Sequence, residues 1–352
     1  MNKFKGFLKR KDIEVSLNRY GIDALSAMAQ GLFCSLLIGT ILNTIGTQFD
    51  LPFIVEIGKF ASAMSGPAMA IAIGYALKCP PLVLFSLAAV GYAANSLGGA
   101  GGPLAVLFIA IIAAEIGKMV SKETKVDILV TPLVTILVGA GLAKLIAPPI
   151  GEVASYVGNL IVLATELRPF LMGIVVSVLC GMALTLPISS AAICQVFGIV
   201  GLAGGAAVAG CCAQMVGFAV ISFKENRWSG LVSQGIGTSM LQMGNIVKNP
   251  RIWIAPTLTS AITGPIATCI FKLEMNGAPV SSGMGTCGLV GQLGVYSGWV
   301  SDIANGLKDA ITINDWIGLI LVSFILPAVI CPLINLVLKK IGWVKDGDMK
   351  LN

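Results

Sequence analysis

The sequence predicts an all-α integral membrane protein with about ten transmembrane helices and two re-entrant hairpins. Only 11% of the 352 residues are charged, 56% are hydrophobic, and the mean hydropathy is +0.90. A soluble domain has about 25% charged residues, so this chain has too few charges to cover a water-exposed surface. Its uncharged stretches are long enough for bilayer crossings, which take about 20 apolar residues each. These stretches are residues 24–49, 79–114, 169–223, 275–301 and 316–338.

The N-terminal segment, residues 1–23, is basic. Its cations are Lys3, Lys5, Lys9, Arg10, Lys11 and Arg19. Lysine and arginine gather on the cytoplasmic side of membrane proteins. We therefore expect a cytoplasmic amino end, and we interpret the net charge of +6 as a sign of membrane orientation rather than of nucleic-acid binding.

Residues 24–149 form the first expected transmembrane bundle. The charge of the loops supports this bundle, because loops with and without lysine alternate along the chain. The expected outer connections are the loop around Asp50 and the turn 98–102, which contain no lysine. The expected inner connections contain Lys78 and the lysines after residue 117. Glu115 and Lys118 are three residues apart at an inner boundary, which predicts an ion pair. The last helix should end at Pro148 and Pro149. The expected helices cover 24–45, 54–77, 80–97, 103–119 and 128–147.

An amphipathic connector, residues 150–168, should join this bundle to a second one over residues 169–338. The tail, residues 339–352, carries Lys339, Lys340, Lys345 and Lys350 and should again be cytoplasmic. Both termini would then lie on the same side, as an even number of crossings requires. The expected helices of the second bundle cover 169–187, 189–203, 205–223, 252–272 and 316–338.

Two stretches of the second bundle do not fit as simple crossings. Residues 229–249 and 274–298 are rich in glycine, hydroxyl and amide residues. Non-helical backbone survives at membrane depth only where protein or a water-filled cavity surrounds it. We therefore expect two re-entrant hairpins, one from each side of the membrane, that enclose a wet chamber.

The candidate substrate ligands lie in and beside these stretches. Carboxylates and amides suit a neutral polyhydroxylated ligand, because each amide both donates and accepts hydrogen bonds. Glu274 stands out as an acid at the start of the second hairpin. The alternative is that these side chains only satisfy the backbone of broken helices. The candidates are Gln242, Asn245, Asn249, Glu274, Asn276, Thr286 and Gln292.

The sequence shows no catalytic residues and no metal or cofactor site. Histidine is absent, which removes Ser–His and Cys–His arrangements. None of the nine cysteines forms a C-x-x-C pair, and no G-x-x-x-x-G-K-[ST] loop is present. We therefore expect no cofactor, no bound metal and no P-loop ATP hydrolysis.

Two motifs carry a resemblance to a known family. Asn249–Pro256 (NPRIWIAP) and Gly283–Gln292 (GMGTCGLVGQ) resemble the membrane IIC components of bacterial phosphotransferase sugar transporters, of the glucose-superfamily-like type. The similarity extends over most of the chain and is closest to a divergent branch known as perfringolysin O regulator-like. It implies Asn249 as a candidate sugar ligand, followed by Thr286 and Gln292.

The resemblance also implies a homodimeric permease of the bacterial cell membrane. Such a permease binds sugar between re-entrant hairpins and passes it by alternating access to a cytoplasmic IIB partner, which phosphorylates it. This chain would then be at most the permease subunit of a sugar phosphotransferase complex. This chain lacks the histidine that many sugar components use, and we expect any IIA and IIB functions in separate proteins. Two alternatives stay open: a membrane sensor or regulator that binds a small molecule without transport, and an ion-coupled secondary transporter.

Overall fold

The computed structural model describes residues 2–351, with side chains from residue 5 onward. Regular structure in this range is helical, apart from an isolated antiparallel bridge between Gly201 and Met275. The chain forms two compact units, Met1–Val153 and Ala154–Asn352. Their boundary falls inside helix α8, Asp127–Thr165, and inside the segment expected to connect two bundles.

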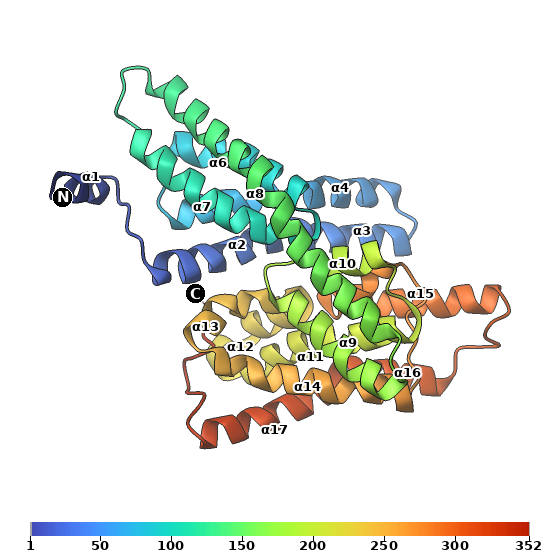
Figure 1. Ribbon diagram of the computed structural model, residues 1–352. Coiled ribbons are helices and arrows are strands. Elements are labelled where there is room, and N and C mark those ends of the chain that lie inside the picture. Colours follow the sequence, from blue (N-terminus) through green and yellow to red (C-terminus); the bar gives the residue numbers. More distant parts are fainter. Residues whose placement is uncertain (1, 352) are drawn as a thin grey trace. The chain divides into compact units, whose positions relative to one another are not determined.

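Unit 1 is a set of helices joined by short turns (Figure 1). Its second helical run, Arg19–Gln48, is continuous through two π-helical turns and is one of the candidate membrane spans. The elements of the unit are α1 Asn2–Arg10, η1 Arg19–Asp23, α2 Ala24–Leu32, η2 Phe33–Leu37, α3 Ile38–Gln48, α4 Pro52–Ala63, α5 Ser65–Ala76, α6 Pro81–Gly98, η3 Gly99–Gly101, α7 Gly102–Val120 and the start of α8.

Helices α6 and α7 form a tight helical hairpin (Figure 1). The chain reverses at Gly99, whose φ of 51° and ψ of −125° suit only a residue without a Cβ atom. Helix α6 also crosses α5 closely, because a Cβ atom on Gly66 would lie 2.4 Å from the carbonyl oxygen of Gly91. Small residues at such crossings let apolar helices approach each other in a membrane.

Helix α8 differs from its prediction. It was expected to end at Pro148 and Pro149, but it continues through both residues to Thr165. Most of the expected connector 150–168 is therefore a continuation of the preceding helix. The turn of the α6–α7 hairpin packs against this region, since a Cβ atom on Gly101 would lie 2.6 Å from the carbonyl oxygen of Ile150. Prolines persist inside membrane helices where neighbouring groups replace the lost contacts.

Unit 2 is built around helix α11, Gly201–Ile221, which is almost completely buried. It packs against α9, α14 and α17 (Figure 1). The elements of the unit are α9 Pro169–Thr185, α10 Ser190–Phe197, α11, α12 Phe223–Val232, η4 Ser233–Gly237, η5 Ser239–Gln242, α13 Met243–Lys248, η6 Pro250–Trp253, α14 Ile254–Pro265, η7 Ile266–Ile270, η8 Pro279–Gly283, η9 Cys287–Leu289, α15 Val290–Ala304, α16 Ile313–Ile320, η10 Leu321–Ile325 and α17 Leu326–Lys340.

Within the described residues, 6 helical runs are long and apolar enough to cross a membrane. One of them, Pro81–Val120, holds both arms of the α6–α7 hairpin. Two expected crossings are interrupted. The 54–77 helix is divided between α4 and α5 at Met64, and the 189–203 helix stops early because α10 ends at Gly198 in the left-handed conformation. The count of about ten crossings stays a prediction.

The two glycine-rich stretches have little regular helix. The first, 229–249, contains the end of α12, then η4, η5 and α13, with a fully extended residue at Thr238. The second, 274–298, runs through η8 and η9 before it enters α15. Their broken backbone agrees with the composition from which hairpins were expected, and their depth in a membrane stays a prediction.

Candidate functional site

The seven predicted ligands do not converge on one site. Asn249 directly precedes the helical run Pro250–Ile270, and Glu274 follows it. At 1.5 Å per residue this 21-residue run is about 30 Å long, similar to the hydrocarbon thickness of a bilayer. A single small molecule therefore cannot touch both residues. The structure divides the candidates into a group at each end of this run and a third group between them.

The first group is an amide cluster, which we define as Gln234, Gln242, Asn245 and Asn249. Gln242 donates to Gln234 at 2.8 Å, and Asn245 donates to Gln242 at 2.8 Å. Their remaining N–H groups reach the C-terminal segment. From here on, the tail means the described residues that follow α17, 341–351. Gln242 donates to the carbonyl of Met349 at 3.0 Å, and Asn245 donates to that of Lys350 at 3.0 Å. The tail thus occupies the place that a ligand was expected to take.

Asn249 has the same kind of partner. Its amide donates to the carbonyl of Trp343 at 3.0 Å and to Asp348 Oδ2 at 2.8 Å, while its Oδ1 accepts from the backbone of Arg251. The last contact caps η6, which explains an asparagine before Pro250 in purely structural terms. In this conformation Asn249 has no free donor for a solute.

Residues at the start of α12 also hold the tail. Both carboxylate oxygens of Glu225 accept from tail backbone, from Gly347 and Met349, at 2.9 Å each. Asn226 accepts from Leu351 and donates to Met349, whose side chain is completely buried. The tail is therefore held as an added segment of unit 2 rather than a free end.

An exposed ion-pair triad completes the docking. Asp346 pairs with Lys224 and with Lys339, at 2.7 Å each. Hydrogen bonds from these two ammonium groups lower the pKa of Asp346 to about 2. The same interaction raises the pKa of Lys224. The carboxylate is thus held charged across the physiological range.

The middle group lies where the two glycine-rich stretches meet. Thr286 of the second stretch is buried and donates a short hydrogen bond to the carbonyl of Gly235 in the first. Next to it, Gly285 has a φ of 54°, and a Cβ atom there would lie 2.7 Å from the Cβ of Cys211 on α11. Only glycine fits this close approach to the central helix.

Gln292 lies near the same helix. Its amide nitrogen donates to Ser323 Oγ at 3.0 Å and contacts Cys212 Sγ at 3.3 Å. Its Oε1 is buried and has no hydrogen-bond partner among the described residues. A buried acceptor without a partner is costly, so this oxygen is suited to receive a donor from a solute or water.

A further buried network is formed by residues that were not among the predicted ligands. Gln214 of α11 accepts from Trp253 Nε1 at 2.9 Å and from Thr185 Oγ1 at 3.2 Å, and Thr185 also contacts Ser239 at 2.8 Å. The network ties α9 and α11 to Ser239 in the first glycine-rich stretch and to Trp253 in η6. The sequence feature that could have indicated this network is Gln214, a single amide side chain in an otherwise apolar helix.

The last group lines a cavity of about 460 Å³, which we call the Glu274 pocket. It lies at the other end of the helical run Pro250–Ile270. Asn276 donates to Glu274 at 3.2 Å and to Asp302 at 2.8 Å. Tight packing sets this geometry, because a Cβ atom on Gly298, one turn before Asp302 on α15, would lie 2.8 Å from the backbone nitrogen of Asn276.

The lining of the Glu274 pocket also has a cationic and aromatic part. Lys308 pairs with Asp315 at 2.9 Å, and its ammonium lies 5.9 Å from the ring centre of Trp299. Asp315 is fixed by the capping box with Thr312 that begins α16. Trp299 packs edge-on against Trp316 at 5.4 Å. The pocket therefore combines acceptors, donors and an aromatic wall.

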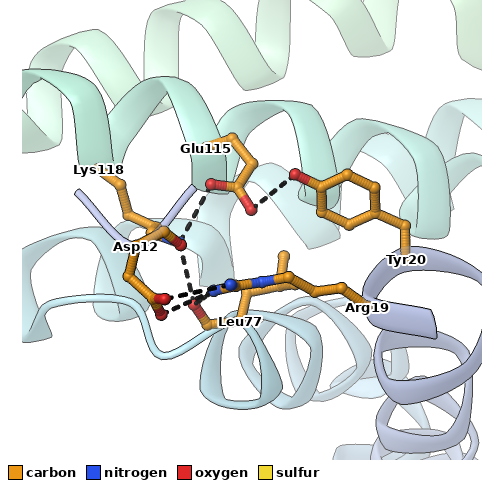
Figure 2. A network of polar contacts seen from close by, with 6 residues as sticks. All are labelled: Asp12, Arg19, Tyr20, Leu77, Glu115 and Lys118. Carbon is orange, nitrogen blue, oxygen red and sulfur yellow. Dashed lines mark hydrogen bonds and ion pairs between the residues drawn. The ribbon is translucent and has the colours of Figure 1, made fainter. Parts of the chain in front are cut away.

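Unit 1 carries its own polar network at the predicted inner boundary (Figure 2). The expected ion pair is confirmed: Lys118 lies 3.1 Å from Glu115, and only 2% of the lysine side chain is exposed. Lys118 also donates to the carbonyls of Asp12 and Leu77. Tyr20 donates to Glu115 at 3.0 Å.

Arg19 completes this network. It pairs with Asp12 at 2.8 Å and donates to the carbonyl of Leu77 at 2.9 Å. The Arg19 guanidinium lowers the pKa of Asp12 through its hydrogen bond. Two cations thus meet the carbonyl at the C-terminal end of α5, where the helix dipole favours positive charge. The network fastens the N-terminal segment to α5 and α7.

Among the described residues, no group of three or more His, Cys, Asp or Glu side chains is arranged to hold a metal ion. No curated protein and no solved structure matches the chain significantly. The sequence profile of one family, described as "Phosphotransferase system, EIIC", matches residues 22–351. This confirms the resemblance seen at the two motifs. With its long apolar helices, the chain is a multi-pass membrane protein that belongs to the phosphotransferase system EIIC family.

Proposed function

We propose that this chain is a sugar permease of a phosphotransferase system and that its solute enters through the Glu274 pocket. The observation that carries the proposal is the chemistry of that pocket. Its volume of about 460 Å³ lies in the range of small-molecule sites, roughly 300–1,000 Å³. Carboxylates, an amide, two ammonium groups and an indole surround one space.

Sugars need this combination of groups. Each hydroxyl both donates and accepts, so Glu274 and Asp302 would accept while Lys308 would donate. Both N–H groups of Asn276 bind these carboxylates, so its amide would offer its oxygen as an acceptor. The apolar faces of the ring would lie against Trp299. Asn276 is already oriented by two carboxylates, and a pre-oriented ligand group loses less entropy on binding.

Transport then proceeds along the direction of α14. The glycine-rich stretches act as re-entrant hairpins, and the Thr286–Gly235 contact between them closes the path in this conformation. Thr286 and Gln292 form a middle set of ligands, and the amide cluster forms the last set. Alternating access requires that the solute bind the outward and inward states with different free energies.

The proposed orientation follows from charge. The start of α12, the end of α17 and the tail carry Lys224, Lys339, Lys340 and Lys345, which favours the cytoplasm for the amide cluster. The Glu274 pocket then faces the outside of a bacterial cell membrane, and both termini are cytoplasmic. A homodimer and separate cytoplasmic IIA and IIB proteins complete the proposed system.

Binding by the purified protein tests the pocket. A thermal-shift screen with sugars should identify a stabilising solute, and calorimetry should then give its affinity. Glu274→Gln and Asn276→Ala should each weaken binding by roughly tenfold or more, because each removes a hydrogen bond in which a charged group takes part. Asp309→Asn is the matched control, since Asp309 is exposed in the same loop region but does not line the pocket. If all three variants bind the solute with the affinity of the unaltered protein, the Glu274 pocket is excluded as the site.

One observation favours an ion-coupled transporter as the second candidate. Three carboxylates, those of Glu274, Asp302 and Asp315, line the same pocket. Uptake into proteoliposomes separates the possibilities. Uptake driven by a sodium or proton gradient supports ion coupling, dependence on IIB and a phosphoryl donor supports the phosphotransferase permease, and binding without uptake supports a sensor.

A further inference from the structure

Unit 1 contains a basic groove outside the proposed solute path. It has a volume of about 340 Å³ and lies between the N-terminal segment and the ends of α5 and α7. Five cations line it: Arg10, Lys11, Lys78, Lys118 and Lys122. Asp12 and Glu123 are its acids, so the lining carries an excess of positive charge.

The five cations are not equally engaged. Lys118 is committed to Glu115 and to two carbonyls (Figure 2). Arg10 and Lys11 share a single oxygen of Glu123, at 2.6 Å each. The ammonium groups of Lys78 and Lys122 have neither an ion pair nor a hydrogen bond within the described part of the chain.

The backbone at the two unengaged lysines is also informative. Lys78 follows α5 with a φ of 57°, and Lys122 follows α7 with a φ of 62°. This left-handed position after a helix is usually filled by glycine, because a Cβ atom is unfavourable there. At both helix ends the chain instead carries a long cationic side chain that lines the groove.

Ser121 supplies an independent observation. It lines the groove and is 3% exposed, and its hydroxyl has no hydrogen-bond partner among the described residues. Its carbonyl accepts a short hydrogen bond from Lys11. A buried hydroxyl without a partner is uncommon in folded proteins and marks a place for a missing acceptor.

We propose that the basic groove is a binding site for a phosphate-bearing anion, which displaces the Glu123 carboxylate from Arg10 and Lys11. Lys78 and Lys122 would neutralise the remaining charge, and the Ser121 hydroxyl would donate to a phosphate oxygen. Basic pockets at the ends of membrane helices bind the headgroups of anionic lipids, and a free phosphate offers the same oxygens. The site is separate from the solute pocket in unit 2.

Two measurements on the purified full chain distinguish the sources of the anion. Native mass spectrometry after incubation with phosphatidylglycerol or phosphatidylcholine reports bound lipid, and calorimetry with inorganic phosphate reports a free anion. The test variant is the double substitution Lys78→Gln and Lys122→Gln. Lys125→Gln is the matched control, because Lys125 is exposed in the same loop and does not line the groove.

We expect the double variant to lose roughly tenfold or more in affinity for phosphatidylglycerol or phosphate, and Lys125→Gln to bind like the unaltered protein. The variant Glu123→Gln should bind these anions more tightly, because it removes the carboxylate that competes with them for Arg10 and Lys11. Binding of phosphatidylglycerol without binding of inorganic phosphate identifies a site for lipid headgroups. Binding of inorganic phosphate identifies a site for a soluble ligand. No binding of either anion, or an equal loss in the double variant and in Lys125→Gln, overturns the proposal.

Discussion

Gln214 is an amide buried completely inside the most deeply buried helix of unit 2. Its Oε1 accepts from Trp253 Nε1 and from Thr185 Oγ1. Thr185 also contacts Gly181 and Ser239, so replacing Gln214 would leave the half-buried Trp253 Nε1 without a partner among the described residues. Gln214→Leu should therefore lower the free energy of unfolding by about 1–3 kcal/mol.

Thermal unfolding in detergent measures this effect. Thr257→Val is the control, because Thr257 meets Gln214 only through a longer contact of 3.4 Å. Thr257→Val should lower the free energy of unfolding much less than Gln214→Leu does. If both variants unfold at the temperature of the unaltered protein, Gln214 does not hold these elements together.

Asp346 gives the tail a defined dependence on pH. Its pKa falls from an ordinary value of 3.8 to about 2 because Lys224 and Lys339 hydrogen-bond to it. A lowered pKa means that the docked state favours the carboxylate. The contribution of Asp346 should be fully present above about pH 4 and be lost as the pH falls through about 2.

Hydrogen exchange of the peptide 343–351 tests this contribution at neutral pH. Asp346→Asn should raise the exchange of this peptide, whereas the neighbouring Lys345→Gln should not, because no ion pair of Lys345 exists among the described residues. Unchanged exchange in Asp346→Asn would mean that Glu225 and Asn226 hold the tail without it.

At the scale of single residues, the sequence predicted some contacts and missed others for a physical reason. Glu115 and Lys118 are one helical turn apart, so their pairing follows from local geometry. Asn249 meets Trp343, a contact between segments separated by 94 residues. No local pattern reveals that backbone carbonyls of the tail satisfy the amide cluster, and this occupancy was therefore not predicted.

Among the elements, the packing of α11 against α9 depends on glycine. A Cβ atom on Gly210 would lie 1.9 Å from the carbonyl oxygen of Ser177, a backbone atom that cannot turn aside. Gly210→Ala should therefore force the two helices apart and destabilise unit 2 by about 1–3 kcal/mol or more.

A second glycine provides the control. Gly141 lies within α8 and a Cβ atom there would meet nothing within 4 Å. Gly141→Ala should be neutral or slightly stabilising, because alanine is the better helix former. Size-exclusion profiles and unfolding temperatures in detergent compare the two variants, and equal stability would show that α9 and α11 tolerate a wider separation.

Helix boundaries show where sequence rules yield to packing. Proline removes a helical donor, which is why α8 was expected to end at Pro148. The helix instead continues, with the α6–α7 turn packed closely against it at Ile150. The glycines of that turn were visible in the sequence, but their partner was not. Composition alone was enough to predict an all-helical membrane protein. Helix boundaries such as the end of α8 could not be predicted in this way, because they depend on tertiary contacts.

For the molecule as a whole, family membership and apolar helices establish a multi-pass membrane protein. Sidedness decides whether the Glu274 pocket can admit a solute from outside. The run Pro250–Ile270 separates that pocket from the amide cluster by about 30 Å, so the two should open on opposite sides of the bilayer.

Labelling in intact cells tests this sidedness. The exposed cysteines Cys34 and Cys269 are first replaced by alanine, which leaves a background with fewer reactive thiols. Asn305→Cys, near the pocket, should then react with a membrane-impermeant maleimide in intact cells, and Lys345→Cys, in the tail, should react only after permeabilisation. The background without either new cysteine is the control for residual labelling. Reaction of both positions from the same side would mean that α14 does not cross the membrane, and the proposed solute path would then have no basis.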